Sequence, residues 1–103
     1  MVRMTTAERR ALQQICGPNG AFCTVAADQR GSMRSVLAAT PEAQAKISDA
    51  DLGAIKSDIV RYLANGAASV LLDPKCAVPQ VVDDGILARD VALIVALDAS
   101  GFD

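Results

Sequence analysis

Three short apolar runs recur along the chain with similar flanking residues. Residues 21–27, 67–72 and 91–97 are almost continuously apolar, and the aspartates Asp28, Asp73 and Asp98 end them. Runs of this length, bounded by turn residues or charges, are typical of β-strands that are buried on both faces. The pattern therefore predicts three buried strands, each ending at an aspartate.

Amphipathic segments separate these runs. A first helix is predicted over residues 7–16, where Thr5 and Glu8 have capping-box spacing, and a turn over residues 17–20 follows it. A stronger helix is predicted to begin at Ser48 and Asp51 and to stop at Asn65 and Gly66. Shorter helices are predicted over 32–39 and 79–88, the latter weakened by a glycine at position 85. The apolar stripe expected on the strong helix contains Leu52, Ile55, Ile59, Val60 and Leu63.

The alternation of strands and helices predicts an α/β fold with a parallel sheet covered on both faces. Three strands alone leave two apolar edges with unpaired backbone groups. Doubly wound domains generally have about five or six strands, and (β/α)8 barrels have eight. The third run is followed by only a few more residues. We therefore expect residues 1–103 to be the front part of a larger α/β domain.

Composition restricts the chemistry. The 103 residues carry 10 Lys and Arg against 12 Asp and Glu, a net charge of −2, so there is no basic excess for a dedicated nucleic-acid binder. Because the chain has no histidine, it can supply neither a Ser-His-Asp triad nor a histidine-ligated metal site. The three cysteines show no C-x-x-C spacing, which argues against a disulfide framework or a zinc knuckle.

No targeting segment is recognisable. The first ten residues lack the apolar core of a signal peptide, and no run of about 18 apolar residues suggests a membrane span. We expect a cytoplasmic protein with no membrane partner, which is the default expectation for such a sequence.

The aspartates at the strand ends are the first candidate site residues. In parallel α/β folds, ligands bind outside the carboxyl ends of the strands. Carboxylates of Asp28, Asp73 and Asp98 on one edge could bind sugar hydroxyls, position a cationic group or hold a divalent metal. The alternative is structural, because aspartate commonly follows a strand to cap a helix or begin a turn.

The densest polar cluster follows the first run. Asp28, Gln29 and Arg30 precede Gly31, where the backbone can approach a ligand closely. An acceptor, an amide and a guanidinium side by side suit recognition of a polyhydroxylated, phosphorylated ligand. The alternative is a surface loop in which the arginine pairs with the aspartate. We favour the site.

A Schiff-base nucleophile would have to be one of three lysines. Lys46 lies in a polar linker, and Lys56 lies in the strong helix off its expected apolar stripe. Lys75 is near a strand end, but nothing apolar surrounds it in the sequence to lower its pKa. We expect all three to be solvated. Neither G-x-G-x-x-G nor a P-loop motif is present.

The three strand ends together resemble the class I aldolases of the tagatose-1,6-bisphosphate aldolase family. The matching segments are 25–31 (VAADQRG), 68–74 (ASVLLDP) and 93–103 (LIVALDASGFD), in the family's order and spacing. The first motif is the most specific of the three. The resemblance covers nearly the whole chain, but only about the first third of a family member.

This resemblance implies a (β/α)8 barrel that cleaves a phosphorylated ketose, such as tagatose 1,6-bisphosphate, to dihydroxyacetone phosphate and an aldehyde. Family members use a lysine Schiff base and need neither metal nor cofactor. The family's Asp-Gln pair lines the substrate pocket and corresponds to Asp28 and Gln29, while Asp73 and Asp98 match positions on the same rim. The Schiff-base lysine and the proton-transferring glutamate lie on later strands, so residues 1–103 alone are expected to be inactive.

Some residues depart from the tagatose-type pattern. Asp98 stands where those enzymes tend to have glutamate, and Asp98 together with residues 80–82 (QVV) resembles the related aldolases of sulfofructose phosphate. Both subgroups make dihydroxyacetone phosphate, so only the aldehyde product differs. Two alternatives to the aldolase remain. One is a non-catalytic α/β module that pairs with a second copy or with the remainder of a barrel, and the other is a small sugar-phosphate-binding domain.

Overall fold

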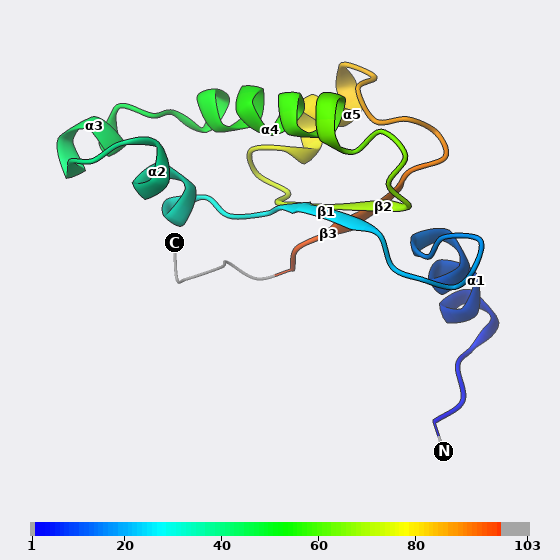
Figure 1. Ribbon diagram of the computed structural model, residues 1–103. Helices are drawn as coiled ribbons and strands as arrows, with labels where there is room; N and C mark the ends of the chain where they lie inside the picture. The colour runs from blue at the N-terminus through cyan, green and yellow to red at the C-terminus, as the bar shows by residue number, and fades with distance from the viewer. Residues whose placement is uncertain (1, 98–103) are drawn as a thin grey trace.

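Three parallel strands pair in the order of the sequence, and helices connect them (Figure 1). The computed structural model describes residues 2–97. Its elements are α1 (Thr6–Ile15), β1 (Thr24–Ala27), α2 (Gly31–Leu37), α3 (Pro41–Ala45), α4 (Asp49–Leu63), β2 (Ser69–Leu72), α5 (Val78–Asp83) and β3 (Ala92–Val95). The predicted α/β class and parallel sheet are confirmed. The sheet is compatible with the beginning of a barrel, although the structure does not contain a whole barrel.

The predicted helix ends match the local chemistry. At the start of α1, the Glu8 amide donates to the Thr5 hydroxyl at 3.2 Å, and the Thr5 amide donates to the Glu8 carboxylate at 2.6 Å. Ser48 and Asp51 form the same reciprocal pair at the start of α4. Just beyond the end of α4, Gly66 has a φ of 87°, a left-handed conformation that favours glycine.

Two helix predictions need correction. The helix predicted over 79–88 is α5 and ends at Asp83, because Gly85 takes a φ of 65° and turns the chain. The segment expected to be a polar linker contains the short helix α3, which Thr40 caps through its hydroxyl.

The buried face of α4 differs from the predicted stripe. Its buried residues are Leu52, Gly53, Lys56, Ser57 and Val60. Leu63, expected to be in the core, is 65% exposed, whereas Lys56, expected to be solvated, is fully buried. Relative to the predicted stripe, α4 is rotated about its axis so that Lys56 faces the sheet. Lys56 forms an ion pair there with Asp73, the residue after β2, as described below.

The two faces of the sheet are covered differently. Side chains of Val25, Val70, Leu72 and Leu93 belong to a core shared with α4 and α5, which lie together on one side of the sheet (Figure 1). Strand residues alternate between faces. Thr24 and Ser69 therefore share the opposite face, where their hydroxyl oxygens lie 2.6 Å apart.

Burial on both faces, predicted for all three strands, is wrong for β1. Thr24 and Ala26 are exposed in β1, and in β3 Ala92 and Ile94 are only half-buried. In β2, Ser69, Val70 and Leu72 are fully buried. The central strand is flanked on both sides, whereas β1 and β3 are edge strands whose second face neither α4 nor α5 reaches within residues 2–97.

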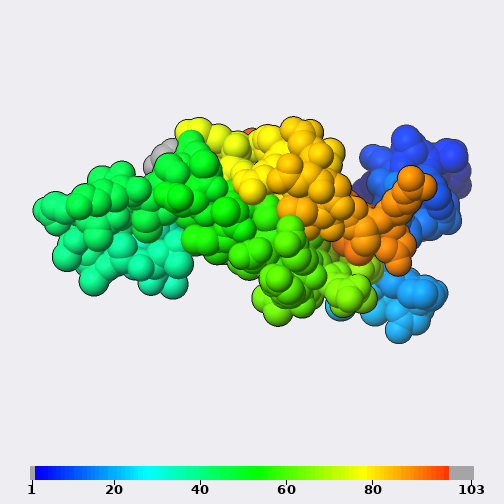
Figure 2. Space-filling model, turned by 90° about the horizontal axis from the view of Figure 1, so that it is seen from above, coloured from blue at the N-terminus to red at the C-terminus, as the bar shows by residue number. Residues whose placement is uncertain are grey.

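Helices α2 and α3 form an arm that projects away from the sheet. Viewed from above, this arm, residues 31–45, forms a separate lobe at one end of the molecule, and α1 lies at the other end (Figure 2). The radius of gyration is 15.3 Å, above the value of about 13 Å for a compact domain of 100 residues. Within the described residues, no helix has the length and apolar character needed to cross a membrane.

We predict that Gly53→Ala destabilises the fold. A methyl group at Gly53 would lie 2.5 Å from the Cys76 carbonyl oxygen and 2.6 Å from Gln80 Oε1. Overpacking of this kind costs about 1–3 kcal/mol, more than the gain of about 1 kcal/mol in helix propensity. Urea denaturation followed by circular dichroism should show a lower midpoint. Asp58→Ala, at an exposed position of α4, is the control and should leave the midpoint unchanged or slightly raised. A raised midpoint for Gly53→Ala would contradict the close approach of α4 to Cys76.

Candidate functional site

Two of the predicted aspartates lie at the same edge of the sheet. Ala27 and Leu72 are register partners at the ends of β1 and β2, so Asp28 and Asp73 follow neighbouring strands at the carboxyl edge. Adjacent strands lie about 4.8 Å apart. The two backbones are therefore close, as the sequence predicts. Asp98 lies outside the described residues.

Asp73 is buried and forms an ion pair with Lys56. The residue is 1% exposed, and one carboxylate oxygen accepts a hydrogen bond from the Lys56 ammonium group, which is fully buried on α4. The sequence contains a signal for the burial of Lys56, although not for its partner, because Lys56 stands midway between Leu52 and Val60 at a spacing of four residues. The expectation that Lys56 is solvated is wrong.

The second oxygen of Asp73 organises the turn after β2. It accepts hydrogen bonds from the Lys75 amide at 3.1 Å and the Cys76 amide at 2.5 Å. Burial raises the pKa of Asp73, but hydrogen bonds from Lys56 and Cys76 outweigh it and leave the pKa below the usual value for aspartate. Asp73 is thus an ionised carboxylate with protein donors on both oxygens. Its predicted role in substrate binding stays a prediction.

Asp28 follows β1 at the position equivalent to that of Asp73 after β2, but its environment differs. It is half-buried, and its side chain has no hydrogen-bond or ion-pair partner within residues 2–97. Gln29 is exposed and Arg30 is half-buried. Arg30 stands at the N-cap of α2, so the segment is a strand-to-helix loop, as predicted. This loop therefore offers a carboxylate and an amide at the carboxyl edge.

A group of charged residues beside this loop was missed in the sequence. The Arg34 side chain donates from Nη2 to Asp49 Oδ1 at 2.7 Å and from Nε to the Ile47 carbonyl at 2.9 Å. The Lys75 ammonium lies 3.3 Å from Asp49 Oδ2. The Arg34 hydrogen bond, followed by that of Lys75, lowers the pKa of Asp49 below its usual value. Hydrophobic periodicity carries no signal for this group, because the three residues lie on separate segments.

The remaining titratable groups add little chemistry at this edge. Burial, followed by the nearby charges of Asp73 and Asp49, raises the pKa of the Cys76 thiol to about 11, so the reactive thiolate is disfavoured. Lys75 is 63% exposed and Lys46 is exposed. Within the described chain, no three Cys, Asp or Glu side chains come together as a candidate metal site.

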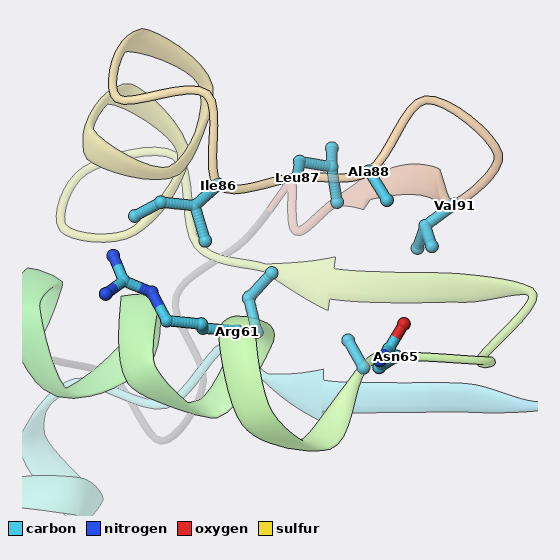
Figure 3. A pocket seen from close by; sticks show the side chains of 8 residues that line it. Arg61, Asn65, Ile86, Leu87, Ala88 and Val91 are labelled. Atoms are coloured by element: carbon cyan, nitrogen blue, oxygen red, sulfur yellow. The ribbon is translucent and has the colours of Figure 1, made fainter.

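Two hollows lie away from the carboxyl edge. One, of about 60 Å³, lies between α4 and the segment before β3 (Figure 3). Ligand pockets usually measure about 300–1,000 Å³, so this hollow is too small for a sugar bisphosphate. A broad hollow of about 1170 Å³ lies between α1 and the amino ends of the strands. Residues lining the small hollow are Val60, Arg61, Ala64, Asn65, Ile86, Leu87, Ala88 and Val91.

Known proteins similar to this chain include aldolases. It is 26% identical over 100 residues to tagatose 1,6-diphosphate aldolase of Lactococcus lactis subsp. lactis, a match that covers 97% of this chain and 29% of that protein. It is 28% identical over 102 residues to tagatose 1,6-diphosphate aldolase of Streptococcus agalactiae serotype V, with the same coverage. It is 26% identical over 105 residues to tagatose 1,6-diphosphate aldolase 2 of Enterococcus faecalis, where the match covers 100% of this chain and 29% of that protein.

These similarities indicate a distant relationship to tagatose 1,6-diphosphate aldolases. The chain spans less than a third of the length of these relatives. No family model matches the chain.

We predict that Lys56→Met is strongly destabilising, because it leaves the Asp73 carboxylate buried without its ammonium partner. Breaking a buried pair from one side costs about 3–5 kcal/mol. Urea denaturation should show this loss, and the double variant Lys56→Met with Asp73→Asn should recover part of it. Lys46→Met, at an exposed lysine, is the matched control. An unchanged midpoint for Lys56→Met would show that the ion pair does not support the fold.

Proposed function

We propose that residues 1–103 are the N-terminal part of a class I aldolase of the tagatose-1,6-bisphosphate type. The reaction is cleavage of a phosphorylated ketose to dihydroxyacetone phosphate and an aldehyde. Tagatose 1,6-bisphosphate is the first substrate to test, and a sulfofructose phosphate is the second. We propose that Asp28, Gln29 and Arg30 bind the substrate. Asp98 belongs to the same proposed set, and Asp73 contributes by holding the edge of the sheet.

The observation that carries this proposal is the difference between Asp28 and Asp73. Both follow strands at the carboxyl edge, but the carboxylate of Asp73 has protein donors on both oxygens, whereas that of Asp28 has none within residues 2–97. A half-buried carboxylate without a protein partner, beside an exposed amide, can accept hydrogen bonds from sugar hydroxyls. Distant homology to named aldolases along almost the whole chain supports the same assignment.

The lysines of this chain do not suit the nucleophile. Lys56 is fully buried in its ion pair, whereas Lys75 is largely exposed and contacts Asp49. Lys46 is exposed and stands at the C-cap of α3. We therefore propose that the Schiff-base lysine lies outside residues 1–103 and that these residues supply part of the substrate site.

Activity and borohydride trapping together test this proposal. The complete product of the gene that encodes these residues should release dihydroxyacetone phosphate from tagatose 1,6-bisphosphate, and borohydride should trap a lysine adduct. The 103-residue chain alone should give no adduct with dihydroxyacetone phosphate. Asp28→Asn should lower kcat/KM by about ten- to a hundredfold, the value of a lost hydrogen bond to a charged group.

Asp58→Asn makes the same change at an exposed position of α4 and should leave kcat/KM unchanged. Mass spectrometry of tryptic peptides locates any adduct. An adduct on Lys75, or a complete gene product that releases no triose phosphate from either ketose, would refute the proposed function.

The uncovered face of the sheet favours one second candidate, a non-catalytic module that pairs with another chain. Exposed Thr24 and Ala26, with half-buried Ile94, form a face that neither α4 nor α5 covers within residues 2–97. Size-exclusion chromatography of the 103-residue chain separates the candidates. We expect a partial barrel to be poorly folded and a pairing module to be oligomeric. A stable, well-folded monomer would contradict both.

A further inference from the structure

Five charged residues form one continuous chain of contacts along the carboxyl edge. Arg34 on α2 pairs with Asp49 at the start of α4, and Asp49 also contacts the Lys75 ammonium. The Lys75 backbone amide donates to Asp73, and Asp73 pairs with Lys56 on α4. We call Arg34, Asp49, Lys75, Asp73 and Lys56 the edge network. It joins three segments that are separate in the sequence.

One end of the edge network lies next to the loop of Asp28, Gln29 and Arg30. Helix α2 begins at Gly31, immediately after this loop, and the Arg34 amide donates to the Arg30 carbonyl at 3.1 Å. This hydrogen bond links the position of Arg34 to the end of the loop. The Arg34 side chain fixes α2 further, because two of its nitrogens donate to two different acceptors, Asp49 and the Ile47 carbonyl.

The other end of the edge network holds the turn after β2. Asp73 accepts hydrogen bonds from two amides of that turn, and Lys56 keeps its carboxylate buried. This end is the buried one, since Lys56 and Asp73 are both almost completely excluded from solvent. The Arg34 end is more solvated, with side-chain exposures of 24% for Arg34 and 43% for Asp49. The edge network therefore connects a buried ion pair, Lys56 with Asp73, to a partly exposed ion pair, Arg34 with Asp49, next to the loop of residues 28–30.

Among residues 2–97, the helices of the arm make few packing contacts with the body of the molecule. Helices α2 and α3 pack on each other and form a separate lobe (Figure 2). Two exposed apolar side chains on α2, Val36 at 85% and Leu37 at 46%, show that this helix is not held by burial. The contacts of Arg34 fasten α2 to the start of α4.

We propose that Arg34 and Asp49 are positioning residues, which hold the loop of Asp28, Gln29 and Arg30 in register with the turn after β2. This inference rests on the proposed function, because the loop is positioned for a phosphorylated ketose. Positioning groups act by fixing the geometry of the residues that touch the substrate, and small displacements there are costly.

Hydrogen exchange and kinetics of the Asp49→Asn variant of the complete gene product test the proposal. Within residues 2–97, Asp49 makes no hydrogen bond to the backbone of residues 28–31 or 75–77, yet the amides of both segments should exchange about two- to fivefold faster. That range corresponds to the loss of partly exposed ion pairs. KM for tagatose 1,6-bisphosphate should rise by a similar factor, with a smaller change in kcat. Arg34→Met should likewise speed amide exchange at 28–31, and Arg34→Lys, which keeps the positive charge, should speed it less.

Ser48→Ala is the matched control. It removes the cap of α4 next to Asp49 but leaves every ion pair of the edge network. Exchange should increase in the first turn of α4 and stay unchanged at 28–31. If Asp49→Asn behaves like Ser48→Ala, with faster exchange in α4 alone and an unchanged KM, the edge network positions nothing and the proposal is overturned. An inactive wild-type enzyme would instead refute the proposed function, which is a separate result.

Discussion

The ion pair between Lys56 and Asp73 is the contact on which the rest of this structure depends. It places Lys56 on the buried face of α4 and connects that helix to Asp73, the residue after the central strand β2. A buried charge without its partner is very unfavourable, so the two residues must meet whenever the chain folds. Their meeting sets the rotation of α4, which in turn brings Gly53 against the Cys76 carbonyl and leaves Leu63 outside the core.

The same ion pair lies between the packed core on the helix side of the sheet and the carboxyl edge, which we propose binds substrate. On the helix side, Val70 and Leu72 are fully buried and make β2 the rigid centre of the sheet. At the carboxyl edge, Asp73 is fixed by Lys56 and by two amides, which gives the edge a defined geometry. Asp28 lies one strand away with no such contacts within residues 2–97. A fixed edge beside a carboxylate that has no partner among the described residues suits a binding site on a rigid scaffold.

Local chemistry predicted much of the fold, and long-range contacts account for the errors. Thr5 with Glu8 and Ser48 with Asp51 are short-range signals, so both helix starts were correct. Lys56 was assigned to solvent because its partner is 17 residues away, and hydrophobic periodicity has no way to represent a buried ion pair. β1 was predicted to be buried on both faces because an apolar run does not show whether its second face has a cover. The placement of Arg34 beside Asp49 depends on how the arm folds back, which no local pattern contains.

The different environments of Asp28 and Asp73 follow from what comes after each strand. After β2, the chain turns immediately into α5, and α4 lies near enough for Lys56 to reach the carboxylate. After β1, the chain enters α2, which leaves the sheet as part of the arm, and no described lysine contacts Asp28. Two aspartates in the same register thus differ because one strand is followed by a packed turn and the other by a projecting arm. Within residues 2–97, the projecting arm therefore brings no partner to the half-buried Asp28 carboxylate, and the role proposed for Arg34 is to hold the arm in this place.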